Sequence, residues 1–110
     1  MKLPNREYAY IPPAKLRDYL LSEKHFIGRS KARFFRHAGF KEENLDLIER
    51  GLMAIAHSED VKEAIQSPHG AKYVLDGPLR TPTGSTVQIR TVWIIDTHED
   101  RPRLVTAYPV

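Results

Sequence analysis

The sequence contains no cysteine. Disulfides, thiol catalysis and cysteine-based zinc or iron–sulfur sites are therefore excluded, and a reducing cytoplasm is the expected location. The sequence also lacks a long apolar segment, because runs such as residues 92–95 are far too short to cross a bilayer. The first residues lack the apolar core of a signal peptide. We therefore expect a protein without a membrane partner.

Motifs of the common enzyme classes are missing as well. There is no Walker loop, no G-x-G-x-x-G, no nucleophile elbow and no acid pair with a glycosidase arrangement. The five histidines show neither H-x-x-x-H nor a mixed carboxylate spacing. We therefore expect neither a metal site nor a cofactor. The 110 residues, 41% of them hydrophobic, predict a single domain, residues 1–110, with one core.

Charge is distributed unevenly along the chain. The net charge is +3, but residues 1–40 carry nine Lys or Arg against three Asp or Glu, whereas residues 41–66 carry three against seven. Residues 24–41 hold six basic residues, no acidic residue and all four phenylalanines. Such a segment favours a polyanionic partner, because Lys and Arg neutralise phosphates and aromatic rings stack on bases. The competing interpretation is a solvated helix whose phenylalanines belong to the core.

The hydrophobic patterns predict helices first and strands afterwards. We expect a short strand at 7–11, helices at 13–22, 31–38 and 42–56, and a further helical turn or two at 58–66. Strands are expected at 71–75, 86–95 and 103–108. The fold class is therefore α+β: an N-terminal short strand and three to four helices packed on one face of a C-terminal, three- to four-stranded antiparallel sheet. In the middle strand, Val87, Ile89, Thr91, Trp93 and Ile95 share one face, and Thr86, Gln88, Arg90, Val92 and Ile94 share the other.

The helix at 31–38 carries candidate functional residues on two sides. One side of the helix is basic, and this basic arc is a candidate phosphate-binding face. The alternative is an ordinary solvated face, and a histidine in the last turn also suits the helix dipole. Lys31 lies on the apolar side instead. It either extends to the surface from the first turn, or is held beside the sheet for phosphate binding or proton transfer. The residues of the basic arc are Arg29, Arg33, Arg36 and His37.

The predicted sheet carries a second set of candidates. Arg90 lies on the face away from Trp93, and Arg103, Thr106 and Tyr108 lie on the last strand. A basic residue beside a hydroxyl in a shallow cleft would stabilise an oxyanion or a phosphorane. The alternative is the ordinary polar outer face of a half-exposed sheet. The register that would bring these residues together cannot be derived from the sequence.

The chain contains the segments GRSKARFF at 28–35, Gly39-Phe40, Gly70 with Tyr73, RTVWI at 90–94 and PRLVTAYP at 102–109. Together these segments resemble a bacterial domain family of unknown function found in toxin and toxin–antitoxin-like gene settings. The resemblance covers almost the whole chain. The order of elements is also similar to that of the barnase/EndoU/colicin/RelE superfamily of metal-independent ribonucleases.

The resemblance implies RNA cleavage by attack of a 2′-hydroxyl on the adjacent phosphate. Lys31 would be the cationic or general acid/base residue, and Arg90 would stabilise the phosphate. Thr106 and Tyr108 would orient the substrate, and Arg33 or Arg103 would hold the backbone. The sequence departs from the best-understood members in having no clear His-plus-Glu pair.

The function expected first is thus a ribonuclease-like toxin acting on RNA or on ribosome-bound RNA, with a small antitoxin- or immunity-like protein as its partner. One alternative is a non-catalytic module that binds nucleic acid or protein within a toxin–antitoxin-like pair. Another is the antitoxin or immunity protein itself. A homodimer through the outer face of the sheet is also open, because Val92 and Ile94 would suit such a contact.

Overall fold

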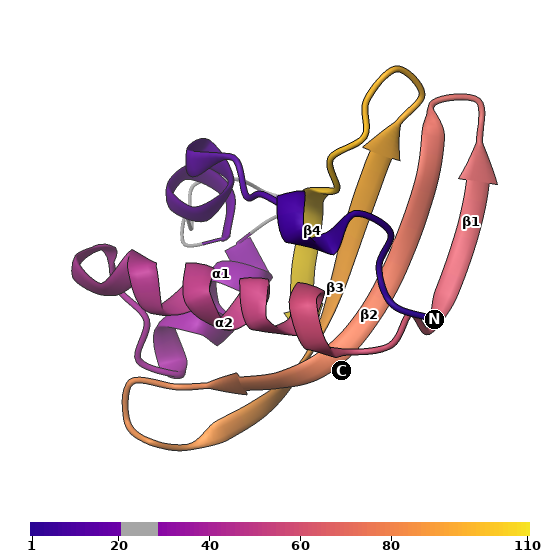
Figure 1. Ribbon diagram of the computed structural model, residues 1–110. Helices are drawn as coiled ribbons and strands as arrows, with labels where there is room; N and C mark the ends of the chain where they lie inside the picture. The colour runs from indigo at the N-terminus through magenta and orange to yellow at the C-terminus, as the bar shows by residue number, and fades with distance from the viewer. Residues whose placement is uncertain (21–28) are drawn as a thin grey trace.

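The centre of the fold is one antiparallel sheet of four strands in chain order (Figure 1). The structure is a computed structural model that describes the backbone of residues 1–20 and 29–110 and the side chains of residues 1–17 and 32–110. Helical segments precede the sheet, so the α+β class is confirmed. The strands are β1 (Glu63–Ser67), β2 (Gly70–Arg80), β3 (Thr86–Asp96) and β4 (Arg103–Pro109).

The helices expected at 31–38 and 42–56 are present. The first is α1 (Arg29–His37), which ends before Gly39, whose φ of +105° a glycine adopts readily. The second consists of a 3-10 turn, η3 (Glu42–Asn44), followed by α2 (Leu45–Ser58). The helix expected at 13–22 corresponds in its described part to η2 (Lys15–Leu20), which has π-helical hydrogen bonding.

The expected N-terminal strand at 7–11 is wrong. Asn5 adopts a left-handed conformation with φ of 55°, which asparagine tolerates better than most residues, and a 3-10 turn, η1 (Arg6–Tyr8), follows. The chain then makes a single parallel bridge between Tyr10 and Arg103 at the edge of β4. Alternation of Tyr8 and Tyr10 with alanine suggested a strand, but the turn at Asn5 interrupts the extended backbone that a strand needs.

The helix expected at 58–66 is also wrong, because residues 63–67 form β1. This strand pairs with the beginning of β2, from Glu63 opposite Val74 to Ser67 opposite Gly70. Apart from Ile65, its residues have little strand propensity, and four of the five residues are exposed. Pairing with β2 therefore determines its conformation, and a tertiary contact of this kind overrides local preference.

Strand β2 is longer than the sequence predicted, because it continues through Pro78 to Arg80. Proline within a strand usually signals its end, since it cannot donate a ladder hydrogen bond. The partner strand β1 reaches only to Val74, however, so the rest of β2 is paired on one side alone, with β3. Pro78 thus occupies an edge position, where its missing N–H leaves no unmet bond.

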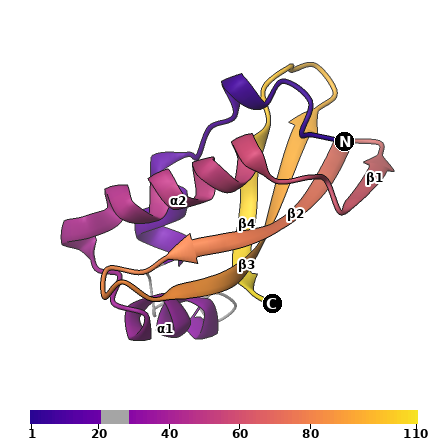
Figure 2. The same cartoon turned by 60° about the horizontal axis from the view of Figure 1, so that its bottom comes forward.

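The core lies where α2 crosses β2, and two glycines allow the close approach. A Cβ added at Gly77 would lie 2.8 Å from Cγ of Glu59 and 3.0 Å from Cγ1 of Ile55, and one added at Gly51 would lie 2.1 Å from Cδ1 of Leu79. Figure 2 shows α2 alongside β2. Phe35 and Phe40 are fully buried in the same cluster as Trp93, so these rings belong to the core.

A buried hydrogen-bonded chain ties the core to the sheet. The indole N–H of Trp93 donates to Oγ1 of Thr91 at 2.8 Å, and that hydroxyl donates to the carbonyl of Leu75 at 2.8 Å. Both side chains are fully buried. Every polar hydrogen in this chain therefore has an acceptor, as a buried polar group requires.

Gly77→Ala is expected to lower the free energy of unfolding by about 1–3 kcal/mol, the usual cost of overpacking, because the new methyl group meets α2. Urea denaturation measures this change. Gln66→Ala on exposed β1 is the control, with an expected effect within about 0.5 kcal/mol. Unchanged or increased stability of Gly77→Ala would show that α2 has room at this position.

Candidate functional site

The face of the sheet that points away from α2 carries most of the polar side chains of β2, β3 and β4. The contacts of α2 at Gly77 and Leu79 place this helix over the odd-numbered positions of β2. Pleating therefore puts the even-numbered positions, paired in register across the strands, on the opposite face. We call this the outer face. It includes Lys72, Val74, Asp76, Arg80, Thr86, Arg90, Val92, Ile94, Arg103, Thr106 and Tyr108.

Arg90 and Asp76 form the central feature of the outer face. They are cross-strand partners, and the guanidinium donates from Nε to Oδ1 of Asp76 at 2.8 Å and from Nη2 to Oδ2 at 2.9 Å. Nζ of Lys62 lies 3.5 Å from the same carboxylate. The side chains of Arg90 and Asp76 remain 29% and 21% exposed. The bidentate geometry fixes the plane of the guanidinium while leaving part of it accessible.

This geometry shifts the pKa of both partners. The two hydrogen bonds from Arg90 hold the pKa of the Asp76 carboxyl below its usual range, against the opposing effect of partial burial, and the charge of Lys62 adds to the shift. Hydrogen bonding to Asp76 in turn raises the pKa of Arg90, with a smaller contribution from Tyr108. The pair is therefore ionised at neutral pH.

The register brings the predicted residues of β3 and β4 together. Tyr108 pairs with Arg90, and Thr106 pairs with the next outer-face residue, Val92. A bulge between Val92 and Trp93 shifts the register, so that Arg103 pairs with Ile94. Its guanidinium donates to Oδ2 of Asp96 at 3.2 Å. Arg90, Thr106 and Tyr108 thus lie on two adjacent rows of one face, while Arg103 lies one row further along.

The candidates on α1 form a separate group. Arg33 and His37 are exposed. Arg36 makes a two-pronged ion pair with Glu42, and its hydrogen bond lowers the pKa of that carboxyl. The side chains of Arg29 and Lys31 lie outside the described residues, so their predicted roles stay predictions.

Sequence reasoning missed three charged residues of this region, namely Lys62, Lys72 and Asp76. Asp76 was overlooked because the predicted strand ended at residue 75, before Gly77-Pro78. Lys62 fell in a predicted helix. Side chains alternate between the two faces along β2, and this pattern continues through Pro78. It is the pattern that would have placed Asp76 opposite Arg90.

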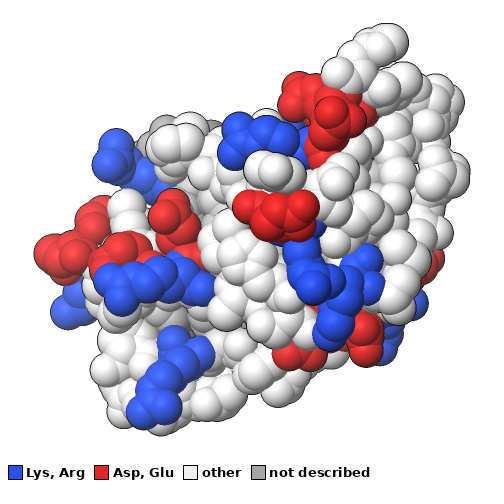
Figure 3. All heavy atoms as spheres, viewed as in Figure 1, with Lys and Arg blue, Asp and Glu red and all other residues white. Residues whose placement is uncertain are grey.

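Charged residues are also present elsewhere on the surface. Figure 3 shows the side that carries α2, where basic and acidic side chains are interspersed rather than gathered into one patch. His69 and His98 line a hollow of about 440 Å³ with Asp96 and Glu99. Among the side chains of residues 1–17 and 32–110, no three His, Asp or Glu residues are grouped as a metal ion would need. Within residues 1–20 and 29–110, no helix is long and apolar enough to cross a membrane.

Asp76→Asn is expected to destabilise the protein at neutral pH but hardly at all in strong acid. Because the folded pKa of Asp76 is depressed, the ionised pair stabilises the fold above the unfolded carboxyl pKa of about 3.9. This stabilisation disappears as the pH falls through the lower folded value. The difference in free energy of unfolding between wild type and variant should therefore be present at about pH 7 and shrink as the pH falls below about 3.9. An equal difference at neutral pH and in strong acid would exclude a role for the carboxylate charge.

Comparison with known proteins places the chain in a family. No curated protein matches it in sequence. Its fold is similar to a chain of a solved contact-dependent growth inhibition toxin–immunity protein complex from Klebsiella pneumoniae 342, with a TM-score of 0.75, 12% identity, and coverage of 94% of this chain and 95% of that chain. At this identity the likeness concerns the fold alone. Residues 2–110 match the family described as Domain of unknown function (DUF6883), and the chain therefore belongs to that family.

Proposed function

We propose that this chain is a toxin-like domain that cleaves RNA at the outer face without a metal ion. The observation that carries the proposal is the cation Arg90, oriented by Asp76, beside the hydroxyls of Tyr108 and Thr106 on two adjacent rows. The fold likeness to a chain of a toxin–immunity complex supports a toxin-related role. It also supports an immunity-like protein partner.

The reaction is the attack of a ribose 2′-hydroxyl oxygen on the adjacent phosphorus. The bond from phosphorus to the 5′-oxygen breaks, a base takes the 2′ proton, and an acid protonates the departing oxygen. Between the attack and the departure, negative charge accumulates on the phosphate, and a fixed cation stabilises this charge. Arg90 suits this part, because its guanidinium has five N–H donors and Asp76 engages two of them.

The remaining parts are assigned to residues of β4 and of α1. Thr106 and Tyr108 orient the phosphate through their hydroxyls, and Arg103 holds the backbone one row away. Asp76 is a positioning residue, since it acts on the substrate through Arg90. Arg33 on α1 is the second backbone contact, together with Arg29, Arg36 and His37. Lys31 stays the cationic or general acid/base residue that the resemblance implies, and its side chain lies outside the described residues.

A second function rests on the same fold likeness. The matched complex contains a toxin and an immunity protein, so a non-catalytic module of such a pair has the same support from the fold. In that case the basic residues of the outer face and of α1 bind RNA or the partner protein. This function predicts that Arg90 variants bind less tightly and that RNA remains intact.

Arg90→Lys is expected to slow RNA cleavage by roughly 100-fold or more, because lysine retains the charge but not the planar, two-pronged donor. Lys31→Ala should abolish cleavage, and Tyr108→Phe should reduce it. Total bacterial RNA and translating ribosomes, incubated in EDTA and followed by gel and primer extension, provide the measurement.

Arg50→Ala is the matched control, because Arg50 is an exposed arginine on α2. Its cleavage rate should equal that of wild type. Equal loss in Arg50→Ala and Arg90→Lys would reject the assignment of the site. Intact RNA with every folded variant would reject the ribonuclease and favour the binding module.

A further inference from the structure

Basic side chains occur at regular intervals along the outer face, beyond the residues assigned to cleavage. On β3, the outer-face positions Thr86, Arg90 and Ile94 follow one another at steps of four residues. Across β2, Thr86 pairs with Arg80, and Ile94 pairs with Lys72. At about 3.4 Å per residue, the two steps of four residues correspond to about 14 Å each. Arg80, Arg90 and Lys72 therefore mark three cationic levels over about 27 Å.

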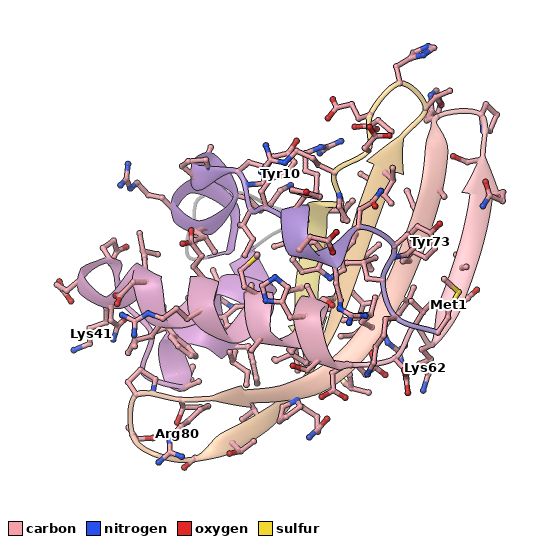
Figure 4. All side chains as sticks on the ribbon, in the orientation of Figure 1. Met1, Tyr10, Lys41, Lys62, Tyr73 and Arg80 are labelled. Atoms are coloured by element: carbon pink, nitrogen blue, oxygen red, sulfur yellow. The ribbon has the colours of Figure 1, made fainter. Side chains whose placement is uncertain are left out.

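The two outer levels have cations available for a ligand. Arg80 is exposed and Lys72 half-buried, and neither pairs with a carboxylate among the described residues. Arg103 adds a second cation at the level of Lys72, because both residues pair with Ile94, one on each side of β3. Figure 4 shows Arg80 at the far end of the β2–β3 hairpin, well away from Lys62. The cations thus extend along β2 and β3 rather than forming one compact cluster.

The shape of this face favours an unpaired strand over a duplex. Duplexes are contacted in their grooves, by elements that insert there or follow the groove surface. The outer face is instead one side of a pleated sheet, with half-buried Tyr108 on the row of Arg90 and half-buried Val92 on the next row. An unpaired strand can place its phosphates on the cations while its bases contact Val92 and the Tyr108 ring.

We infer that the outer face binds single-stranded RNA lengthwise, with Arg80 and Lys72 holding phosphates on either side of the one at Arg90. This inference deepens the proposed function and rests on it, because it names unpaired RNA as the substrate class. Arg80 and Lys72 contribute affinity, whereas Arg90 stabilises the reacting phosphate.

Fluorescence anisotropy tests the inference with a labelled 2′-O-methyl RNA single strand of about ten nucleotides. This probe cannot be cleaved by 2′-hydroxyl attack, so binding is measured apart from catalysis. One lost phosphate contact lowers the slope of log affinity against log salt by about 0.7, which corresponds to about fourfold weaker binding at 0.15 M salt. Arg80→Ala and Lys72→Ala should each show this loss. Arg17→Ala, with the same change of charge as Arg80→Ala, should not, because Arg17 is an exposed arginine on η2 and does not line the hollow that Arg80 shares with Arg50.

Two further comparisons vary the length and the pairing of the probe. A trinucleotide is too short to reach both outer levels at once, so its affinity should not fall in both Arg80→Ala and Lys72→Ala. A duplex of the same sequence as the ten-nucleotide probe should bind more weakly than the single strand. Equal losses in Arg80→Ala and Arg17→Ala, equal binding of duplex and single strand, or no binding at all would overturn the inference. Binding with the expected pattern but without cleavage of natural RNA would reject the proposed function and leave the inference standing. Cleavage by wild type with unaltered binding in Arg80→Ala and Lys72→Ala would support the proposed function and overturn the inference.

Discussion

The long pairing between β2 and β3 is the constraint on which both the core and the candidate site depend. Eleven residues of each strand are in register, from Gly70 opposite Asp96 to Arg80 opposite Thr86. Because side chains alternate along a strand, this single register places Leu75, Leu79 and Trp93 under α2 and Asp76 and Arg90 on the other side. A shift by one residue would exchange the two sets. Core packing and site geometry are therefore specified together.

The outer face is more than an accumulation of positive charge. Arg90 and Arg103 each have a carboxylate partner, at Asp76 and Asp96. Paired arginines attract distant polyanions less than unpaired ones, but they are held in a definite orientation and retain unused donors. Affinity for a polyanion and orientation of one phosphate are thus assigned to different residues. Lys72 and Arg80, which have no carboxylate partner among the described residues, lie toward the ends of the face, and Arg90 lies in the middle.

The sequence predicted much of the fold and part of the site. The two faces of β3 followed from alternation, and α2 followed from its helical spacing. The sequence could not show that one face carries Arg90, Thr106 and Tyr108. The bulge beside Val92 is a property of the paired strands and leaves no pattern in the sequence of either strand alone. Asp76 and β1 were missed for a related reason: Pro78 and the helix-forming residues of β1 contradict local preference and are accommodated only by neighbouring strands.

The buried chain from Trp93 through Thr91 to Leu75 has an optical consequence. Trp93 is the sole tryptophan of the sequence, and its ring is fully buried directly beneath the sheet that carries Arg90. Its emission therefore reports on the polarity and packing of the interior, while the indole itself lies on the face away from any ligand bound at Arg90. A ligand that rearranged the sheet would change this emission, whereas one that bound to a rigid sheet would leave it unaltered. The chain thus carries its own spectroscopic probe of whether the outer face and the core move together.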